Sequence, residues 1–208
     1  MVALLASFTI TSASSVEAKT VKLVAFGDSL TTGYGLPKAD SFAAKLEVAL
    51  RARGLDVIVT NAGVSGDTAS AGLARLDWSV PQGTDGVIVE LGANDMLRGL
   101  SPATTRKALT EILTRLKARD VPVLLAGMRA APNMGADYQK TFDAIFPDLA
   151  RDFGTLYYPF FLEGVAGTRS LNLPDGIHPT AAGIDIIVAN ILPKAEELVR
   201  LASRRAGQ

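Results

Sequence analysis

The sequence predicts an α/β fold in which helices cover both faces of a five-stranded parallel sheet. Two observations support this prediction: five short apolar runs alternate with segments whose apolar residues recur at helical spacing, and the first three runs end in loops rich in Gly, Asp, Ser and Asn. Strands that alternate with helices form parallel sheets through right-handed crossovers. The simplest arrangement is a three-layer α/β/α structure with the flavodoxin-like strand order 2-1-3-4-5.

The elements follow one another in a regular alternation. The predicted strands are residues 21–26, 57–60, 86–91, 121–126 and 155–158. The predicted helices are one that begins near Phe42 and ends near Gly54, one that ends near Asp77, one at 104–119, one at 138–149, and a last one that contains Ile184 and Leu192. Pro147 should kink or restart its helix because proline has no backbone N–H to donate.

The composition limits the function classes. A chain of 208 residues suits one domain, and its formal net charge of +0 gives no attraction to nucleic acid, so we expect a small-molecule partner. There is no cysteine and only one histidine. These counts exclude disulfides, thiolate metal sites, a cysteine nucleophile and a multi-histidine metal site. Nothing in the sequence indicates a particular oligomeric state.

Residues 1–20 differ in character from the rest of the chain. An apolar stretch at 2–10 is followed by small polar residues and by Val16-Glu17-Ala18, which fits an export leader cleaved after Ala18. We therefore expect a periplasmic or secreted protein. Because a basic n-region is missing, a disordered tail on a cytoplasmic protein is the alternative. Residues 21–208 are expected to form a single domain without stable membrane insertion.

Five chemically useful residues fall at one predicted edge of the sheet. Ser29, Gly66 and Asn94 lie in the loops after the first three strands, and Asp175 and His178 lie in the turn before the last helix. Ligands of open α/β sheets bind at the carboxyl edge of the strands. Each residue also has a plainer explanation: a helix cap for the serine or the asparagine, a turn for the glycine, and a structural role for the histidine. It is improbable that all of these explanations hold together.

These residues supply what acyl transfer requires. A serine hydroxyl becomes a good nucleophile when an imidazole accepts its proton, and an acceptor on the other ring nitrogen must hold that imidazole in one tautomer. Ser29, His178 and Asp175 can fill these roles. Donors for the oxyanion of the tetrahedral intermediate would be the Ser29 and Gly66 backbone N–H groups and the Asn94 carboxamide. This mechanism needs no metal and no cofactor.

Four segments resemble the sequence blocks of the SGNH, or GDSL, family of esterases and lipases. They occur in the family's order, and the resemblance extends from about residue 21 to about residue 199. The segments are GDSL at 27–30, GVSGDT at 63–68, GAND at 92–95 and DGIHP at 175–179. Within the family, the chain most resembles the bacterial subgroup of thioesterase I, lysophospholipase L1 and arylesterase.

The resemblance implies the same roles as the residues themselves. It makes Ser29 the nucleophile, His178 the general base and then acid, and Asp175 the residue that orients the imidazole. It makes Ser29, Gly66 and Asn94 the oxyanion hole. The implied activity is the hydrolysis of carboxylic esters through an acyl-enzyme.

Two other function classes remain open. Four acidic residues at the same edge could hold Mg²⁺ for phosphoryl transfer, although the chain has no Gly-Lys-Ser/Thr phosphate loop. They are Asp28, Asp67, Asp95 and Asp175; the family resemblance instead implies that Asp28 and Asp67 brace their loops. A binding module without turnover is the other class, and the intact set of serine, histidine, aspartate and asparagine argues against it.

Apolar and small residues in the neighbouring loops predict that the site accepts an acyl or aryl group. The candidates for this contact are Met96, Leu97, Pro132, Phe160 and Phe161. Because the chain has no sizeable lid insertion, we expect a shallow groove and short to medium acyl chains. Longer thioesters, such as acyl-CoA, or lysophospholipids are the alternative that the family resemblance implies.

Overall fold

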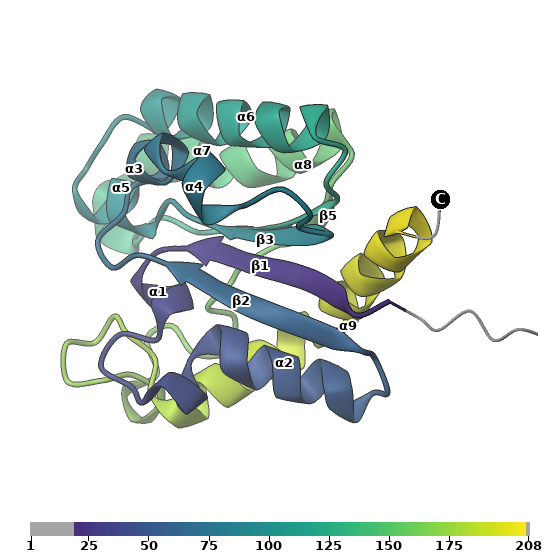
Figure 1. The fold of residues 1–208 in the computed structure, drawn as a ribbon. Coiled ribbons are helices and arrows are strands. Elements are labelled where there is room, and N and C mark those ends of the chain that lie inside the picture. Colours follow the sequence, from purple (N-terminus) through teal and green to yellow (C-terminus); the bar gives the residue numbers. More distant parts are fainter. Residues whose placement is uncertain (1–18, 207–208) are drawn as a thin grey trace, which may run out of the picture.

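A five-stranded parallel sheet forms the centre of the computed structural model, which describes residues 19–206. Its strand order, β2-β1-β3-β4-β5, confirms the predicted order (Figure 1). The strands are β1 (Val21–Gly27), β2 (Val57–Gly63), β3 (Gly86–Glu90), β4 (Val123–Ala126) and β5 (Leu156–Tyr158). The leader or tail was expected at residues 1–20, and of these, residues 1–18 lie outside the described residues.

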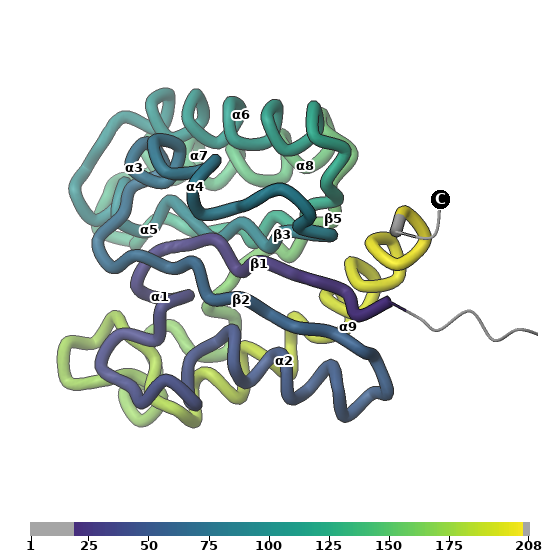
Figure 2. Tube along the Cα trace, in the orientation of Figure 1, coloured from purple at the N-terminus to yellow at the C-terminus, as the bar shows by residue number. Residues whose placement is uncertain are grey.

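Nine α-helices lie within residues 19–206. They are α1 (Ser29–Thr32), α2 (Phe42–Ala52), α3 (Ala69–Ala74), α4 (Leu76–Ser79), α5 (Ala93–Leu97), α6 (Pro102–Ala118), α7 (Ala136–Asp143), α8 (Ile145–Phe153) and α9 (Ala181–Ala206). Helices α2 and α9 cover one face of the sheet, and α3, α4, α6, α7 and α8 cover the other (Figure 1). This confirms the three-layer prediction. Figure 2 shows the start of β1 and the end of α9 on one side of the molecule, away from α1.

Apolar side chains from both helical layers pack against the sheet. Every residue of β3 is buried, as expected for a central parallel strand covered on both faces. The largest fully buried side chains include Phe26, Phe42, Phe142, Phe146 and Phe161. Within residues 19–206, no helix combines the length and apolar character that crossing a bilayer requires.

All five strands differ from their predicted bounds by at least one residue, and β2 and β4 differ by more than one. β2 continues to Gly63 instead of ending at Thr60, because its last residues stay in register with the end of β1. β4 begins at Val123, so Pro122 precedes the strand and its missing N–H removes no hydrogen bond from within it.

Two helices are interrupted. The helix expected to end near Asp77 is two short helices, α3 and α4, separated at Arg75. The helix expected at 138–149 is also two, because α7 ends at Asp143 and α8 begins at Ile145. Pro147 cannot donate to the carbonyl of Asp143, four residues earlier, so the restart predicted for this helix is confirmed.

The last residue of β3, Glu90, is a fully buried carboxyl group. Glu90 lies beside Gly27, the last residue of β1. A side chain on Gly27 would overlap both Glu90 and Thr31. Glu90 Oε2 accepts a hydrogen bond of 2.8 Å from the Thr31 hydroxyl, and its Oε1 has no hydrogen-bond partner within residues 19–206. Glu90 therefore lies directly beneath the turn that leaves β1.

Hydrogen bonding decides which of two neighbouring buried carboxyl groups, Glu90 or Asp28, keeps its proton. Burial, reinforced by the nearby Asp28 carboxyl, raises the pKa of Glu90 well above its ordinary value of 4.5. Burial also raises the pKa of Asp28, but hydrogen bonds donated by Leu30 and Asn94 favour its charged form. Glu90, with one oxygen unpaired, is the group that stays neutral.

Replacing Glu90 by glutamine tests this protonation state. Because the folded-state pKa of Glu90 is raised, its contribution to stability is fully present below pH 4.5 and is lost as the pH rises toward the folded-state value. Glutamine does not titrate. The free energy of unfolding of Glu90→Gln should therefore rise relative to wild type above pH 4.5, by up to about 1.4 kcal/mol per pH unit.

Urea unfolding of both proteins at several pH values between about 4 and 8 measures this difference. Glu111→Gln, at an exposed carboxyl on α6, is the matched control. A difference between Glu90→Gln and wild type that stays constant across the range would contradict a buried neutral Glu90.

Candidate active site

Ser29 is placed by the turn between β1 and α1. It is the first residue of α1, and the preceding Asp28 caps the helix, because its Oδ1 accepts a hydrogen bond of 3.0 Å from the Leu30 N–H. The interpretation of Ser29 as a cap is therefore wrong. Ser29 is only 8% exposed, so its hydroxyl lies at the sheet edge with little access to bulk water.

The predicted relay from Ser29 to Asp175 is assembled in the structure. His178 Nε2 lies 2.9 Å from Ser29 Oγ, and His178 Nδ1 lies 2.7 Å from Asp175 Oδ2. Both distances are hydrogen bonds. The serine comes from the turn after β1 and the other two residues from the turn before α9, so the relay joins two loops that are far apart in sequence.

Asp175 is held ionised by hydrogen bonds. The His178 ring, and after it the backbone N–H of His178, lower the pKa of Asp175 to about 2. Asp175 Oδ1 also accepts hydrogen bonds of 3.0 Å from the N–H groups of Ile177 and His178. An ionised Asp175 accepts a hydrogen bond from the Nδ1–H group, which keeps the proton on Nδ1 and leaves Nε2 as the acceptor for the serine hydroxyl.

The turn that carries Asp175 and His178 is closed at its base. Asn172 and Pro179 form an isolated antiparallel bridge, and the Leu173 N–H donates to the His178 carbonyl at 2.7 Å. The imidazole and its carboxylate are thus fixed relative to each other before either contacts Ser29.

Asn94 lies on α5, which follows β3. Its Nδ2 donates a hydrogen bond of 2.9 Å to Asp28 Oδ2, and the same side chain lines a cavity together with Ser29 and His178. An amide nitrogen carries two hydrogens, so one remains for a ligand. Asp28 therefore both caps the helix that begins at Ser29 and orients the Asn94 side chain, the predicted oxyanion donor.

Gly66 lies in the loop between β2 and α3. Its φ of +86° favours glycine, and its carbonyl accepts a hydrogen bond of 2.7 Å from Arg98, the residue after α5. This bond ties the loop of Gly66 to the helix of Asn94. Within residues 19–206, the N–H groups of Ser29 and Gly66 donate no hydrogen bond.

A cavity of about 510 Å³ opens beside the relay. Ser29, Asn94 and His178 contribute its reactive groups, and most of its other lining residues are apolar or small. Four of the predicted substrate contacts line it: Met96, Leu97, Pro132 and Phe160.

Phe161 does not line this cavity, so its prediction as a substrate contact is wrong. It is fully buried in the core and packs edge-on against Phe42, with 4.9 Å between the ring centroids. The chain turns from residue 161 onward, and Phe160, just before this turn, is the phenylalanine that lines the cavity.

Sequence reasoning missed other lining residues. Met128 follows β4 by two residues, so its place at the same sheet edge was a usable signal. Ile177, between Asp175 and His178, was another. The partner of Asp67 had no sequence signal: Arg75 binds it at 2.6 Å and also donates to the carbonyls of Gly27 and Ala62 near the ends of β1 and β2.

The acidic residues of the rival magnesium hypothesis have separate partners. Asp28 binds Asn94, Asp67 binds Arg75 and Asp175 binds His178. Asp95 accepts hydrogen bonds from the Ala69 N–H and the Thr105 hydroxyl. Among the residues that the structure describes, no three His, Asp or Glu side chains are grouped to hold a metal ion. The geometry thus favours acyl transfer over phosphoryl transfer.

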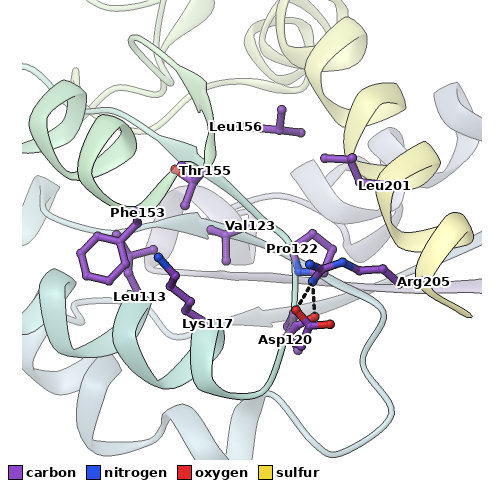
Figure 3. Close-up of a pocket in the computed structure, with 12 residues that line it drawn as sticks. Leu113, Lys117, Asp120, Pro122, Val123, Phe153, Thr155, Leu156, Leu201 and Arg205 are labelled. Atoms are coloured by element: carbon purple, nitrogen blue, oxygen red, sulfur yellow. Dashed lines mark hydrogen bonds and ion pairs between the residues drawn. The ribbon is translucent and has the colours of Figure 1, made fainter. Parts of the chain in front are cut away.

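A second cavity, of about 330 Å³, lies where β4 and β5 begin, at the edge of the sheet opposite Ser29 (Figure 3). Its charged side chains already have partners: Arg205 lies 2.7 Å from Asp120, and Lys117 lies over the ring of Phe153. None of the predicted site residues lines it.

Comparison with known proteins gives a consistent result. The chain matches the GDSL-like lipase/acylhydrolase family over residues 25–186. It is 39% identical to the arylesterase of Vibrio mimicus, over 80% of this chain and 84% of that protein. It is also 39% identical to thioesterase 1/protease 1/lysophospholipase L1 of Escherichia coli (strain K12), over 76% of this chain and 74% of that protein.

A solved structure is similar as well. The crystal structure of AlinE4, an SGNH-hydrolase family esterase, is 47% identical in sequence, with a TM-score of 0.74 over 87% of this chain and 97% of that chain. The family match, these relatives and the shared fold together show that this chain belongs to the GDSL, or SGNH, hydrolase family.

Proposed function

We propose that this protein hydrolyses carboxylic esters through an acyl-enzyme formed on Ser29. The observation that carries the proposal is the continuous hydrogen-bonded relay Ser29–His178–Asp175 at the mouth of an apolar cavity. Relatives named esterase and arylesterase support the same reaction class.

The reaction has two symmetrical halves. As Ser29 Oγ attacks the ester carbonyl, its proton passes to His178 Nε2, and the carbonyl oxygen becomes an oxyanion. Collapse of this intermediate breaks the bond to the alcohol, which takes the proton from Nε2 and leaves. A water molecule then attacks the acyl-enzyme, giving a proton to Nε2, and Ser29 recovers that proton as the acid is released. Asp175 stabilises the imidazolium in both halves.

The oxyanion would be held by three donors. These are the backbone N–H groups of Ser29 and Gly66 and the remaining Nδ2 hydrogen of Asn94. The bond from Asn94 to Asp28 supports this role, because it fixes the amide before substrate arrives. Such fixed donors need no reorganisation when charge develops.

The lining of the cavity supports the proposal that it binds the acyl or aryl group of the substrate. A volume of about 510 Å³ falls within the usual range for small-molecule sites, and its apolar lining favours hydrocarbon. We propose short to medium acyl or aryl esters as substrates. Longer thioesters and lysophospholipids are the second candidate, favoured by the cavity's size and by the similarity to thioesterase 1/protease 1/lysophospholipase L1. The leader-like segment before Ala18 supports a place outside the cytoplasm.

Replacing Ser29 by alanine tests the central proposal. We expect wild type to hydrolyse p-nitrophenyl esters and Ser29→Ala to lose at least about a thousandfold in kcat, because the nucleophile is gone. Esters from acetate to palmitate, acyl-CoA and lysophosphatidylcholine would be compared in one panel. Ser203→Ala, at an exposed serine of α9, is the control and should match wild type. Equal activity of wild type and Ser29→Ala would refute the proposal.

Replacing Asn94 by alanine tests the oxyanion hole. We expect kcat to fall by about a hundredfold or more while KM changes little, because the amide acts mainly on the transition state. Asn190→Ala, at an exposed asparagine on α9, should keep full activity. Reduced thermal stability with unchanged kcat per folded molecule would instead make Asn94 a structural residue.

The same substitution at two adjacent positions tests the cavity. Phe160→Leu should change the ratio of kcat/KM between long and short acyl esters and alter the free energy of unfolding by less than about 0.5 kcal/mol. Phe161→Leu should keep the chain-length profile and lower the free energy of unfolding by about 1–2 kcal/mol, because its ring fills the core. Kinetics on the ester panel and urea unfolding measure both effects. The reverse pattern would contradict the assignment of the two rings.

A further inference from the structure

Tyr34 covers one face of the His178 imidazole. The two ring centroids are 4.4 Å apart, with 32° between the ring planes. The His178 side chain is only 15% exposed, whereas Tyr34 is 51% exposed. Tyr34 does not line the acyl cavity, so its ring contacts the imidazole from outside the space that substrate would fill.

The backbone ties Tyr34 to the nucleophile. The N–H groups of Gly33 and Tyr34 both donate to the carbonyl of Ser29, at 3.1 Å each. Gly33 and Gly35 on either side have φ values of +81° and +73°, which L side chains rarely adopt. These two glycines reverse the chain after α1 and return it toward the imidazole.

The same segment also contacts the loop of His178. A Cβ at Gly35 would lie 2.8 Å from Leu173 Cδ1, so the segment after Tyr34 lies close to the Leu173 side chain. Leu173 in turn donates its N–H to the His178 carbonyl. Tyr34 is therefore held between the two loops whose alignment sets the contact from Ser29 to His178.

The Tyr34 ring against the imidazole has a specific consequence for catalysis. When Ser29 gives its proton to Nε2, the imidazole becomes a cation, and the face of an aromatic ring attracts a cation. The ionisable groups that face this imidazole are Asp175 on Nδ1 and Asp28 beneath the nucleophile. Tyr34 adds attraction at one face of the imidazole, and it restricts rotation of the ring.

We propose that Tyr34 is a positioning residue, whose ring fixes the His178 imidazole toward Ser29 and stabilises the imidazolium formed when Ser29 is deprotonated. This inference rests on the proposed esterase function. The Tyr34 hydroxyl donates no hydrogen bond within residues 19–206, so the proposal assigns the effect to the ring and not to the hydroxyl.

Two substitutions distinguish an effect of the aromatic ring from an effect of any apolar side chain that shields the imidazole from water. Tyr34→Phe keeps the ring face, and Tyr34→Leu keeps an apolar cover without it. Because Tyr34 is half exposed, both variants should fold, and thermal melting checks this. Trp78→Leu, which removes an aromatic ring that is 83% exposed on α4, is the matched control.

His178 is the only histidine in the chain, so NMR can follow the titration of its ring without any substrate. We expect Tyr34→Leu to move the midpoint of that titration down by about half a pH unit, and to lower kcat about two- to fivefold at unchanged KM. Tyr34→Phe and Trp78→Leu should match wild type in both measurements.

Three results would overturn the proposal: an unmoved midpoint in Tyr34→Leu, equal effects of Tyr34→Phe and Tyr34→Leu, or a loss confined to KM. Failure of the proposed function is a different result, in which wild type hydrolyses no ester or Ser29→Ala is as active as wild type. In that case, the NMR midpoint still decides whether Tyr34 stabilises the imidazolium.

Discussion

Parallel pairing of β1 with β2 on one side and β3 on the other is the constraint on which the site depends. The register brings Gly27 opposite Gly63 and opposite Glu90, so the three strands end at one level. The loops that leave them must then share the space above that edge. The loops that carry Ser29, Gly66 and Asn94 begin at the same edge because the backbone hydrogen bonds of the sheet align the ends of the three strands.

Beneath that edge, buried polar groups replace what would otherwise be apolar packing. Asp28 accepts from the Leu30 N–H and from Asn94, and Thr31 donates to Glu90. Burying a carboxyl group costs free energy unless it is hydrogen-bonded or neutral, and these two carboxyls use one solution each. The arrangement makes the turn between β1 and α1 rigid in a way that apolar side chains cannot, because hydrogen bonds constrain direction as well as distance.

Periodicity and loop composition were sufficient to predict the strand order and the residues of the relay. Apolar runs ending in Gly, Asp and Ser identified the edge, and a histidine three residues after an aspartate identified its partner. What failed was the direction of side chains. Phe160 and Phe161 are the same residue type, and the sequence does not show that Phe161 is the one that packs against Phe42 in the core. Arg75, Tyr34 and Glu90 act through contacts with residues distant in sequence, and a single sequence carries no record of such contacts.

The relay is also divided unevenly between two parts of the fold. His178 and Asp175 come from one short turn that is closed by the bridge between Asn172 and Pro179, whereas Ser29 belongs to the sheet. The imidazole and its carboxylate therefore form one local unit of the chain, and Ser29 contacts this unit from a separate part of the fold. The bond between imidazole and carboxylate is thus set by the geometry of that one turn, whereas the contact from Ser29 to His178 depends on how the turn sits against the edge of the sheet.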